Sequence, residues 1–424
     1  MISINSFLTA YVLLYAIVSA SDFIIDGINS RHIRRHGNEV PEGFDSVIDR
    51  DQLERIESYT LDNIRLGFVR DLTGRIIFLT IILSGLLPWL AEMLKNLPFI
   101  IAGLCFFAVP AVIGAVFGLP FDYYSIFHIE EIYGFNTRTL KVWIMDLFKS
   151  LLIGVVLGII LLSLLLFMVK STGNGWWIWS WLIFLCFQLV IAVIYPTVIA
   201  PVFNRFTPLD NQDLSERIRD LAEKEGLDIK GIFTMDAARR TLHTNAYFSG
   251  LGKTKRIVLY DTLLESHDDD EVLSVLAHEI GHLKKGHIKK QLLIMGVMTL
   301  LLFFVASEMI HWGYLYESFG FDSRPFYAGL FIIMIIWEPV GFFLSPIGMA
   351  ISRRFEKEAD HYVYKVMGDT SHIVRALKRM ARDNLSNLRP HPLYVAFHYS
   401  HPPLLERIRY LEACQTKSDS LPGE

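Results

Sequence analysis

The chain has 424 residues, of which 52% are hydrophobic and 20% are charged, with a mean hydropathy of +0.37 and a net charge of −4. This composition is more apolar than that of a typical soluble domain, and it offers no broad basic surface for a nucleic-acid partner. The three cysteines, Cys105, Cys186 and Cys414, form no CxxC motif and no pairing pattern, so we expect neither a disulfide framework nor a thiolate metal site.

Seven long apolar runs follow one another along the chain. Each is long enough for a membrane-spanning helix, which takes about 20 mostly apolar residues. We do not expect the first run to be a signal peptide, because no Lys or Arg precedes Arg31 and a signal has a basic start. The runs are about 4–21, 76–93, 98–119, 151–169, 176–202, 292–311 and 326–351.

The distribution of Lys and Arg predicts the orientation of these spans. The loops after the first, third and fifth runs and the C-terminal tail are rich in both, whereas the alternate loops carry only Lys95, Lys170 and Arg324. Basic loops stay in the cytosol, so we expect the N-terminus outside and the C-terminus in the cytosol. Depending on the host, the membrane is the bacterial inner membrane or that of the endoplasmic reticulum.

The polar regions divide the chain into four parts. Residues 1–203 are expected to hold spans one to five with cytosolic loops at about 22–75 and 121–150. Residues 204–290 and 352–424 are expected to be two parts of one protease domain, separated by spans six and seven in 291–351. Two spans leave and return, so the two parts emerge on the same face and can pack together.

The segment VLAHEIGHLKKGH, residues 275–287, carries the most informative motif. It is predicted to be helical, so His278 and His282 project from one face, one turn apart, where both can bind one zinc ion. Glu279 can lie beside the metal and take a proton from water. Gly281 is expected to leave room for a substrate backbone. The alternative is a pair of histidines on an amphipathic helix without a metal.

A third metal ligand has to come from elsewhere in the chain. The best candidate is Glu356 in SRRFEKEAD, with Asp360 one helical turn away as a hydrogen-bond acceptor or proton donor, and Glu358 is a less favoured candidate. An exposed acidic helix face is the alternative for this segment. His287 is five residues beyond His282, so we expect a polar surface residue rather than a ligand.

Three further positions have a functional and a structural interpretation. Residues 244–260 are predicted to form two strands joined by a Gly-containing turn, and an exposed edge strand could bind substrate beside Asn245. Asn245 could instead be a simple turn residue, and His401, before Pro402, a capping or buried histidine. Glu338 lies in the middle of the seventh run, where a carboxylate usually faces a cavity or a partner.

These motifs together resemble the type I CAAX prenyl endopeptidases, which are integral-membrane zinc proteases with a cytosolic active site. The resemblance rests on HEIGH, SRRFEKEAD and HYSHPPLLERI, and on segments 128–140, 241–250 and 255–265. It implies a mainly α, polytopic seven-helix membrane protein that encloses a chamber and carries a cytosolic zincin-like metalloprotease domain. It also implies one zinc ion per chain. By this resemblance the metal ligands are His278, His282 and Glu356. The catalytic residues are Glu279, Asp360 and His401, and the residue that contacts the substrate is Asn245.

The expected function is therefore that of a membrane-embedded zinc metalloendopeptidase, and the resemblance implies C-terminal prenylated peptides as substrates. A broad quality-control protease for membrane proteins is an alternative, and a chamber-forming chaperone or channel with a relict metal site is another. The expected partners are a peptide or lipidated protein substrate and the lipid bilayer. No obligate protein partner is indicated.

Overall fold

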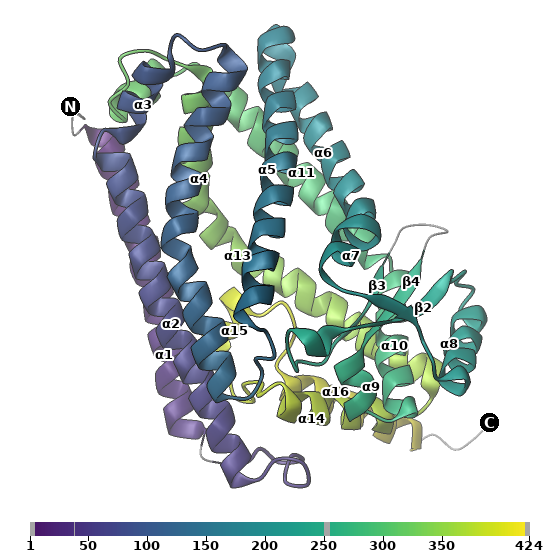
Figure 1. Ribbon diagram of the computed structural model, residues 1–424. Coiled ribbons are helices and arrows are strands. Elements are labelled where there is room, and N and C mark those ends of the chain that lie inside the picture. Colours follow the sequence, from purple (N-terminus) through teal and green to yellow (C-terminus); the bar gives the residue numbers. More distant parts are fainter. Residues whose placement is uncertain (1–4, 38, 250–254, 420–424) are drawn as a thin grey trace.

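The computed structural model describes residues 5–37, 39–249 and 255–419. Long helices form its tall upper part, and a small sheet with short helices forms the lower part (Figure 1). Six helices are long and apolar enough to cross a membrane, and a bent helix pair brings the number to seven among the described residues. Each of the seven predicted runs falls on one of these elements, so the polytopic seven-helix prediction is confirmed.

The seven runs fall on α1 (Ser6–His36), α2 (Arg50–Leu83) with α3 (Leu86–Leu94), α4 (Phe99–Tyr124), α5 (Leu140–Ser171), α6 (Trp176–Ile194) with the π-helical turn Tyr195–Ile199 and α7 (Ala200–Phe203), α11 (His287–Met309) and α13 (Phe326–Met367). The second run differs from its prediction as a single span, because α2 and α3 meet at an angle of 55°. Gly85 lies in the break with φ +80°, a left-handed conformation that glycine adopts without steric cost.

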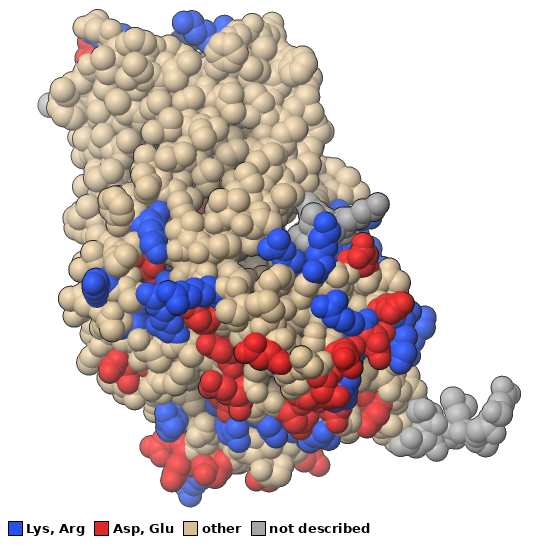
Figure 2. Space-filling model, turned by 45° about the vertical axis from the view of Figure 1, so that its right-hand side comes forward, with Lys and Arg blue, Asp and Glu red and all other residues tan. Residues whose placement is uncertain are grey.

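The surface supports a membrane location for the upper part. Figure 2 shows a broad uncharged zone over the long helices, with few charges at its upper rim, whereas Lys, Arg, Asp and Glu gather over the lower part. Large apolar side chains such as Leu151, Ile159 and Phe167 of α5 are exposed. Apolar surface of this extent is typical of contact with lipid.

The lower part contains a four-stranded sheet with the order β1-β2-β4-β3. Its strands are β1 (Phe206–Pro208), β2 (Gly231–Met235), β3 (Ala246–Ser249) and β4 (Arg256–Tyr260). β3 pairs antiparallel with β4, and Ala246 lies opposite Leu259. The predicted strand pair is confirmed, and β3 is an edge strand as expected, whereas the turn at 250–254 lies outside the described residues.

Short helices complete the lower part, and the one with the HEIGH motif begins at a strong cap. They are α8 (Gln212–Lys224), α9 (Asp261–Ser266), α10 (Asp269–Lys284), α14 (Ser371–Asp383), α15 (Pro392–His398) and α16 (Leu404–Asp419). Asp268 and Glu271 form a reciprocal capping box at the start of α10, which satisfies backbone N–H groups that lack helical partners.

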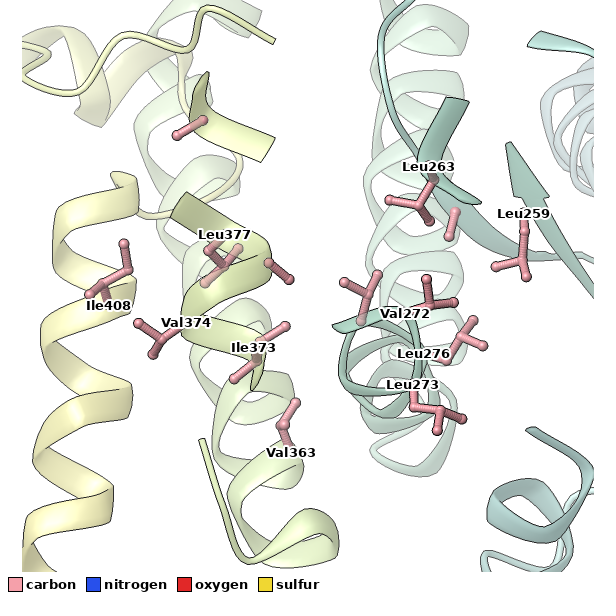
Figure 3. Close-up of a cluster of buried hydrophobic side chains, with 14 of the residues drawn as sticks. Leu259, Leu263, Val272, Leu273, Leu276, Val363, Ile373, Val374, Leu377 and Ile408 are labelled. Carbon is pink, nitrogen blue, oxygen red and sulfur yellow. The ribbon is translucent and has the colours of Figure 1, made fainter. Parts of the chain in front are cut away.

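A buried apolar cluster fixes α10 against the C-terminal helices. Figure 3 shows side chains of β4, α9 and α10 on one side and of α13, α14 and α16 on the other. Leu276, Val363 and Leu411 are fully buried members of this cluster. Because the cluster joins segments about 100 residues apart in sequence, it brings the two polar regions of the chain into one packed body.

Helices α10 and α13 approach each other closely at Gly281. A Cβ atom at Gly281 would lie 3.0 Å from Cβ of Tyr362 and 3.1 Å from Cα of Ala359. Gly281 is itself buried. The expectation that Gly281 leaves room for a substrate is therefore wrong, since its missing side chain lets the helix with Glu356 pack against the helix with the two histidines.

Candidate active site

Two imidazoles and one carboxylate converge where α10 crosses α13. His278 Nε2 lies 3.2 Å from His282 Nε2 and 3.2 Å from Glu356 Oε2, and His282 Nε2 lies 3.3 Å from Glu356 Oε1. One possible ligand atom from each of these residues lies within 4.8 Å of the others. The structure thus brings together the three residues expected as metal ligands.

The chemistry of this group fits a bound cation. His278 Nδ1 lies 2.9 Å from Asp360 Oδ1, so a proton on Nδ1 satisfies that contact and leaves a bare lone pair on Nε2. Oε2 of Glu356 is buried and accepts no hydrogen bond from any described residue, although Nε2 of His278 lies 3.2 Å away. Lone pairs that face one another in a buried site repel, and a divalent cation at their centre removes that repulsion.

Arg407 of α16 supports the first histidine and was not predicted from the sequence. Its Nη2 and Nε donate to Asp360 Oδ1 at 2.6 Å and Oδ2 at 2.9 Å. Asp360 is fully buried, and this bidentate pair compensates its charge. The pair fixes the carboxylate that orients His278. The segment LLERIRY, which contains Arg407, does not by itself indicate this role, because the contact joins two helices that are distant in sequence.

His287 supports the second histidine, which corrects the prediction that it is a polar surface residue. Only 1% of His287 is exposed, and its Nδ1 lies 3.0 Å from Nδ1 of His282. Its Nε2 lies 3.2 Å from Oε2 of Glu358, and its ring stacks on Phe355 at 4.3 Å. Glu358, the less favoured ligand candidate, thus contacts His287, and Glu356 faces the histidine pair.

The expected catalytic side chains Glu279 and His401 lie at this group. Glu279 is half-buried on α10, and burial raises the pKa of its carboxyl while His278 and His282 lower it. His401 is exposed, and its Nε2 lies 3.2 Å from Oε1 of Glu356. The alternative of a buried histidine is therefore wrong for His401, whereas the alternative of a capping histidine is not tested by this exposure.

Asn245 is exposed immediately before the edge strand β3. The chain leading to it is held by a polar network: Thr244 N donates to Asn384 Oδ1 at 3.0 Å, and His243 Nε2 lies 3.2 Å from Glu130 Oε2. Glu130 also accepts a hydrogen bond of 2.6 Å from Tyr59. This network ties the edge strand to α2 and to the π-helical turn Ser125–Glu130 that follows α4, so the membrane helices help to place β3 beside the site.

A helix with an HExxH motif, packed on a helix that supplies a third carboxylate and joined to several apolar helices, defines a membrane metallopeptidase. Comparison with known proteins agrees. The protein-family model described as "CAAX prenyl protease N-terminal, five membrane helices" matches residues 29–205. The family model described as "Peptidase family M48" matches residues 208–415. The chain belongs to peptidase family M48 and is a multi-pass membrane metalloendopeptidase.

Individual relatives match nearly the whole chain. The CAAX prenyl protease 1 homolog of Arabidopsis thaliana is 35% identical over 390 residues, which cover 90% of this chain and 92% of the relative. CAAX prenyl protease 1 of Saccharomyces cerevisiae is 33% identical, with 89% and 90% covered. The crystal structure of S. mikatae Ste24p is 30% identical and covers 95% of this chain and 99% of its own, with a TM-score of 0.88. The resemblance seen in the sequence is confirmed.

Proposed function

We propose that this chain is a zinc endopeptidase that cleaves prenylated proteins near a C-terminal CAAX sequence. The observation that carries the proposal is the convergence of Glu356 on His278 and His282, with Oε2 of Glu356 buried and without a hydrogen-bond partner in the described part of the chain. The substrate class comes from relatives that are named CAAX prenyl proteases.

In this proposal His278, His282 and Glu356 hold one zinc ion. When bound, zinc supplies a Lewis acid and raises the acidity of water in the site. The carboxylate of Glu279 accepts a proton from the attacking water and returns it to the nitrogen of the leaving amine. His401 donates a hydrogen bond toward the scissile carbonyl oxygen as negative charge develops there.

Two residues have supporting roles. Asp360 keeps the proton of His278 on Nδ1, so that Nε2 stays free to bind the metal. Asn245 precedes the edge strand, where an extended peptide can pair with β3 through main-chain hydrogen bonds. Together they orient the first ligand and the substrate backbone.

We also propose the orientation in the membrane. The N-terminus lies outside, and residues 204–290 and 352–424 form one protease domain on the cytosolic side, with 1–203 and 291–351 supplying the spans. The membrane is that of the endoplasmic reticulum or the bacterial inner membrane, according to the host. The basic loops on that side support this orientation.

The test compares three substrates with the purified full-length protein in lipid vesicles: a farnesylated CAAX peptide, the same peptide without the lipid, and an unfolded membrane protein. We expect zinc-dependent cleavage of the farnesylated peptide within its C-terminal segment, mapped by mass spectrometry. If the unfolded membrane protein is cleaved efficiently and neither peptide is cleaved, the result would contradict the proposal and favour a quality-control protease.

A further inference from the structure

A cavity of about 580 Å³ lies among α1, α2, α4 and α13, away from the metal-binding group. Its wall on α4 is uncharged and consists of Pro110, Gly114, Phe117, Gly118 and Phe121. The spacing of these residues places them on one face of the helix, which we call the α4 stripe. Ile77, Phe78 and Ile81 of α2 and Phe331 of α13 extend this apolar wall, for which we call the space the apolar cavity. The rest of its lining is mostly polar and includes the charged side chains Arg70, Asp71, Arg75 and Glu338.

Three glycines keep the apolar cavity open. Gly74 of α2 and Gly114 and Gly118 of α4 line it, and a Cβ atom added at any of them would meet no heavy atom of the described residues within 4 Å. Glycine disfavours a helix by about 1 kcal/mol relative to alanine. The three glycines therefore leave space that side chains of larger residues could fill without a clash at the Cβ position.

The apolar cavity adjoins a second, polar cavity of about 480 Å³, because Arg70 and Asp71 line both. Asn384 and Tyr399 line the far side of the polar cavity. Asn384 holds Thr244, the residue before Asn245, and Tyr399 is two residues from His401. The two cavities thus extend from the α4 stripe to the chain next to Asn245 and His401, and the side chains of the metal-binding group lie outside the lining of both.

We propose that the apolar cavity holds the isoprenoid chain of the substrate, while the peptide runs through the polar cavity to the metal-binding group. This inference rests on the proposed function, because it assumes a lipidated peptide substrate. The volume lies in the range of about 300–1,000 Å³ typical of ligand pockets. The α4 stripe offers a continuous uncharged wall between helices expected to lie in the membrane, where a lipid chain can enter from the side.

Binding of the isoprenoid chain in the cavity would fix the position of the substrate and would contribute little hydrophobic free energy. Lipid tails are as apolar as the cavity, so the transfer from bilayer to cavity has little driving force. A chain held in the cavity nevertheless keeps the attached peptide near the catalytic residues, which raises its effective concentration there. The inference therefore predicts a faster reaction for the lipidated peptide, and this advantage depends on the open space beside the α4 stripe.

The experiment fills this space and measures cleavage of the farnesylated and unlipidated forms of one CAAX peptide in vesicles. Gly114→Leu and Gly118→Leu place a side chain in the cavity, and Gly154→Leu is the matched control. Gly154 is an exposed helical glycine of α5, and an added Cβ would have no heavy atom of the described chain within 4 Å. It does not line either cavity. We expect the ratio of kcat/KM for lipidated over unlipidated peptide to fall roughly ten-fold in the two cavity variants and to stay unchanged in the control.

An unchanged ratio in both cavity variants would overturn the inference, and the proposed function would stand. If the wild-type protein cleaves neither peptide, the proposed function itself fails. A second measurement needs no variant: a peptide whose isoprenoid carries a photoreactive diazirine is crosslinked to the wild-type protein. We expect crosslinks at residues 110–121 and 77–81, and crosslinks confined to other helices would contradict the inference.

Discussion

At the scale of single residues, the site depends on side chains that contact Nδ1 of His278 and Nδ1 of His282, the ring nitrogens that face away from the metal-binding group. Asp360 contacts Nδ1 of His278, and His287 contacts Nδ1 of His282. The sequence was sufficient to predict that the two histidines of HExxH share one helix face, and that Glu356 and Asp360 share another, because helical spacing alone places such pairs on one face. It was misleading for His287, whose predicted direction assumed that the helix continues. Instead α10 ends at Lys284, and Gly286 with φ +66° turns the chain so that His287 faces back to His282.

The role of His287 can be tested by substitution. Loss of a group that orients a metal ligand typically weakens metal affinity about 10–100-fold. We expect His287→Ala to lower zinc affinity in this range, measured by competition with a chelator, and Glu358→Gln to have a smaller effect. His361→Ala, at an exposed position of α13, is the control. Wild-type affinity in His287→Ala would show that this histidine has no orienting role.

At the scale of the elements, the crossing of α10 and α13 holds the metal-binding group together. The sequence predicted both helices from their periodicity, but it did not show that the seventh run and the segment with Glu356 form one continuous helix, α13. Nor did it show that Gly281 is the contact point, since a glycine in a motif can serve either substrate access or helix packing. Only the tertiary packing separates these two roles.

Gly281→Ala tests that packing. The added Cβ would press on backbone atoms of Ala359, which cannot rotate away. We expect a loss of stability of about 1–3 kcal/mol, typical of overpacking, together with weaker zinc binding. Gly154→Ala is the control, because open space surrounds that position and alanine favours a helix. Thermal unfolding checks both, and an unchanged Tm in Gly281→Ala would contradict close packing at this position.

The junction of α9 and α10 should make the lower part sensitive to acid. Burial lowers the pKa of His267 below its usual 6.5, although Glu271 and Asp383 raise it and Arg379 lowers it further. The unfolded chain then binds more protons than the folded one below about pH 6.5, so stability is complete above that pH and declines as the pH falls. We expect His267→Gln to flatten this decline in Tm measured against pH. An identical pH dependence in the variant would exclude His267 as a cause.

At the scale of the whole molecule, composition predicted a polytopic membrane protein, because long apolar helices need lipid or a core around them. The 55° bend between α2 and α3 and the two cavities could not be predicted, since they depend on how several helices pack. Glu338 lines the apolar cavity, as expected for a carboxylate within a span, whereas the hydration of that cavity stays a prediction.

The orientation of the chain gives a separate prediction for the whole molecule. A reporter inserted at Gly173, between α5 and α6, should lie on the side opposite to a reporter fused to the C-terminus, because an odd number of spans separates them. Protease protection in sealed vesicles distinguishes the two sides. Equal accessibility of both reporters would contradict the seven-span arrangement and the meeting of α10 with α13 on one face.

The central claim is that His278, His282 and Glu356 hold a catalytic metal at which Glu279 transfers the proton. The most direct test measures zinc per chain and peptide cleavage in Glu279→Gln, with Glu356→Ala as the comparison. We predict one zinc ion per chain in Glu279→Gln with cleavage reduced at least about 100-fold, and loss of zinc in Glu356→Ala. Cleavage at the wild-type rate by zinc-loaded Glu279→Gln, or full zinc content in Glu356→Ala, would contradict the claim.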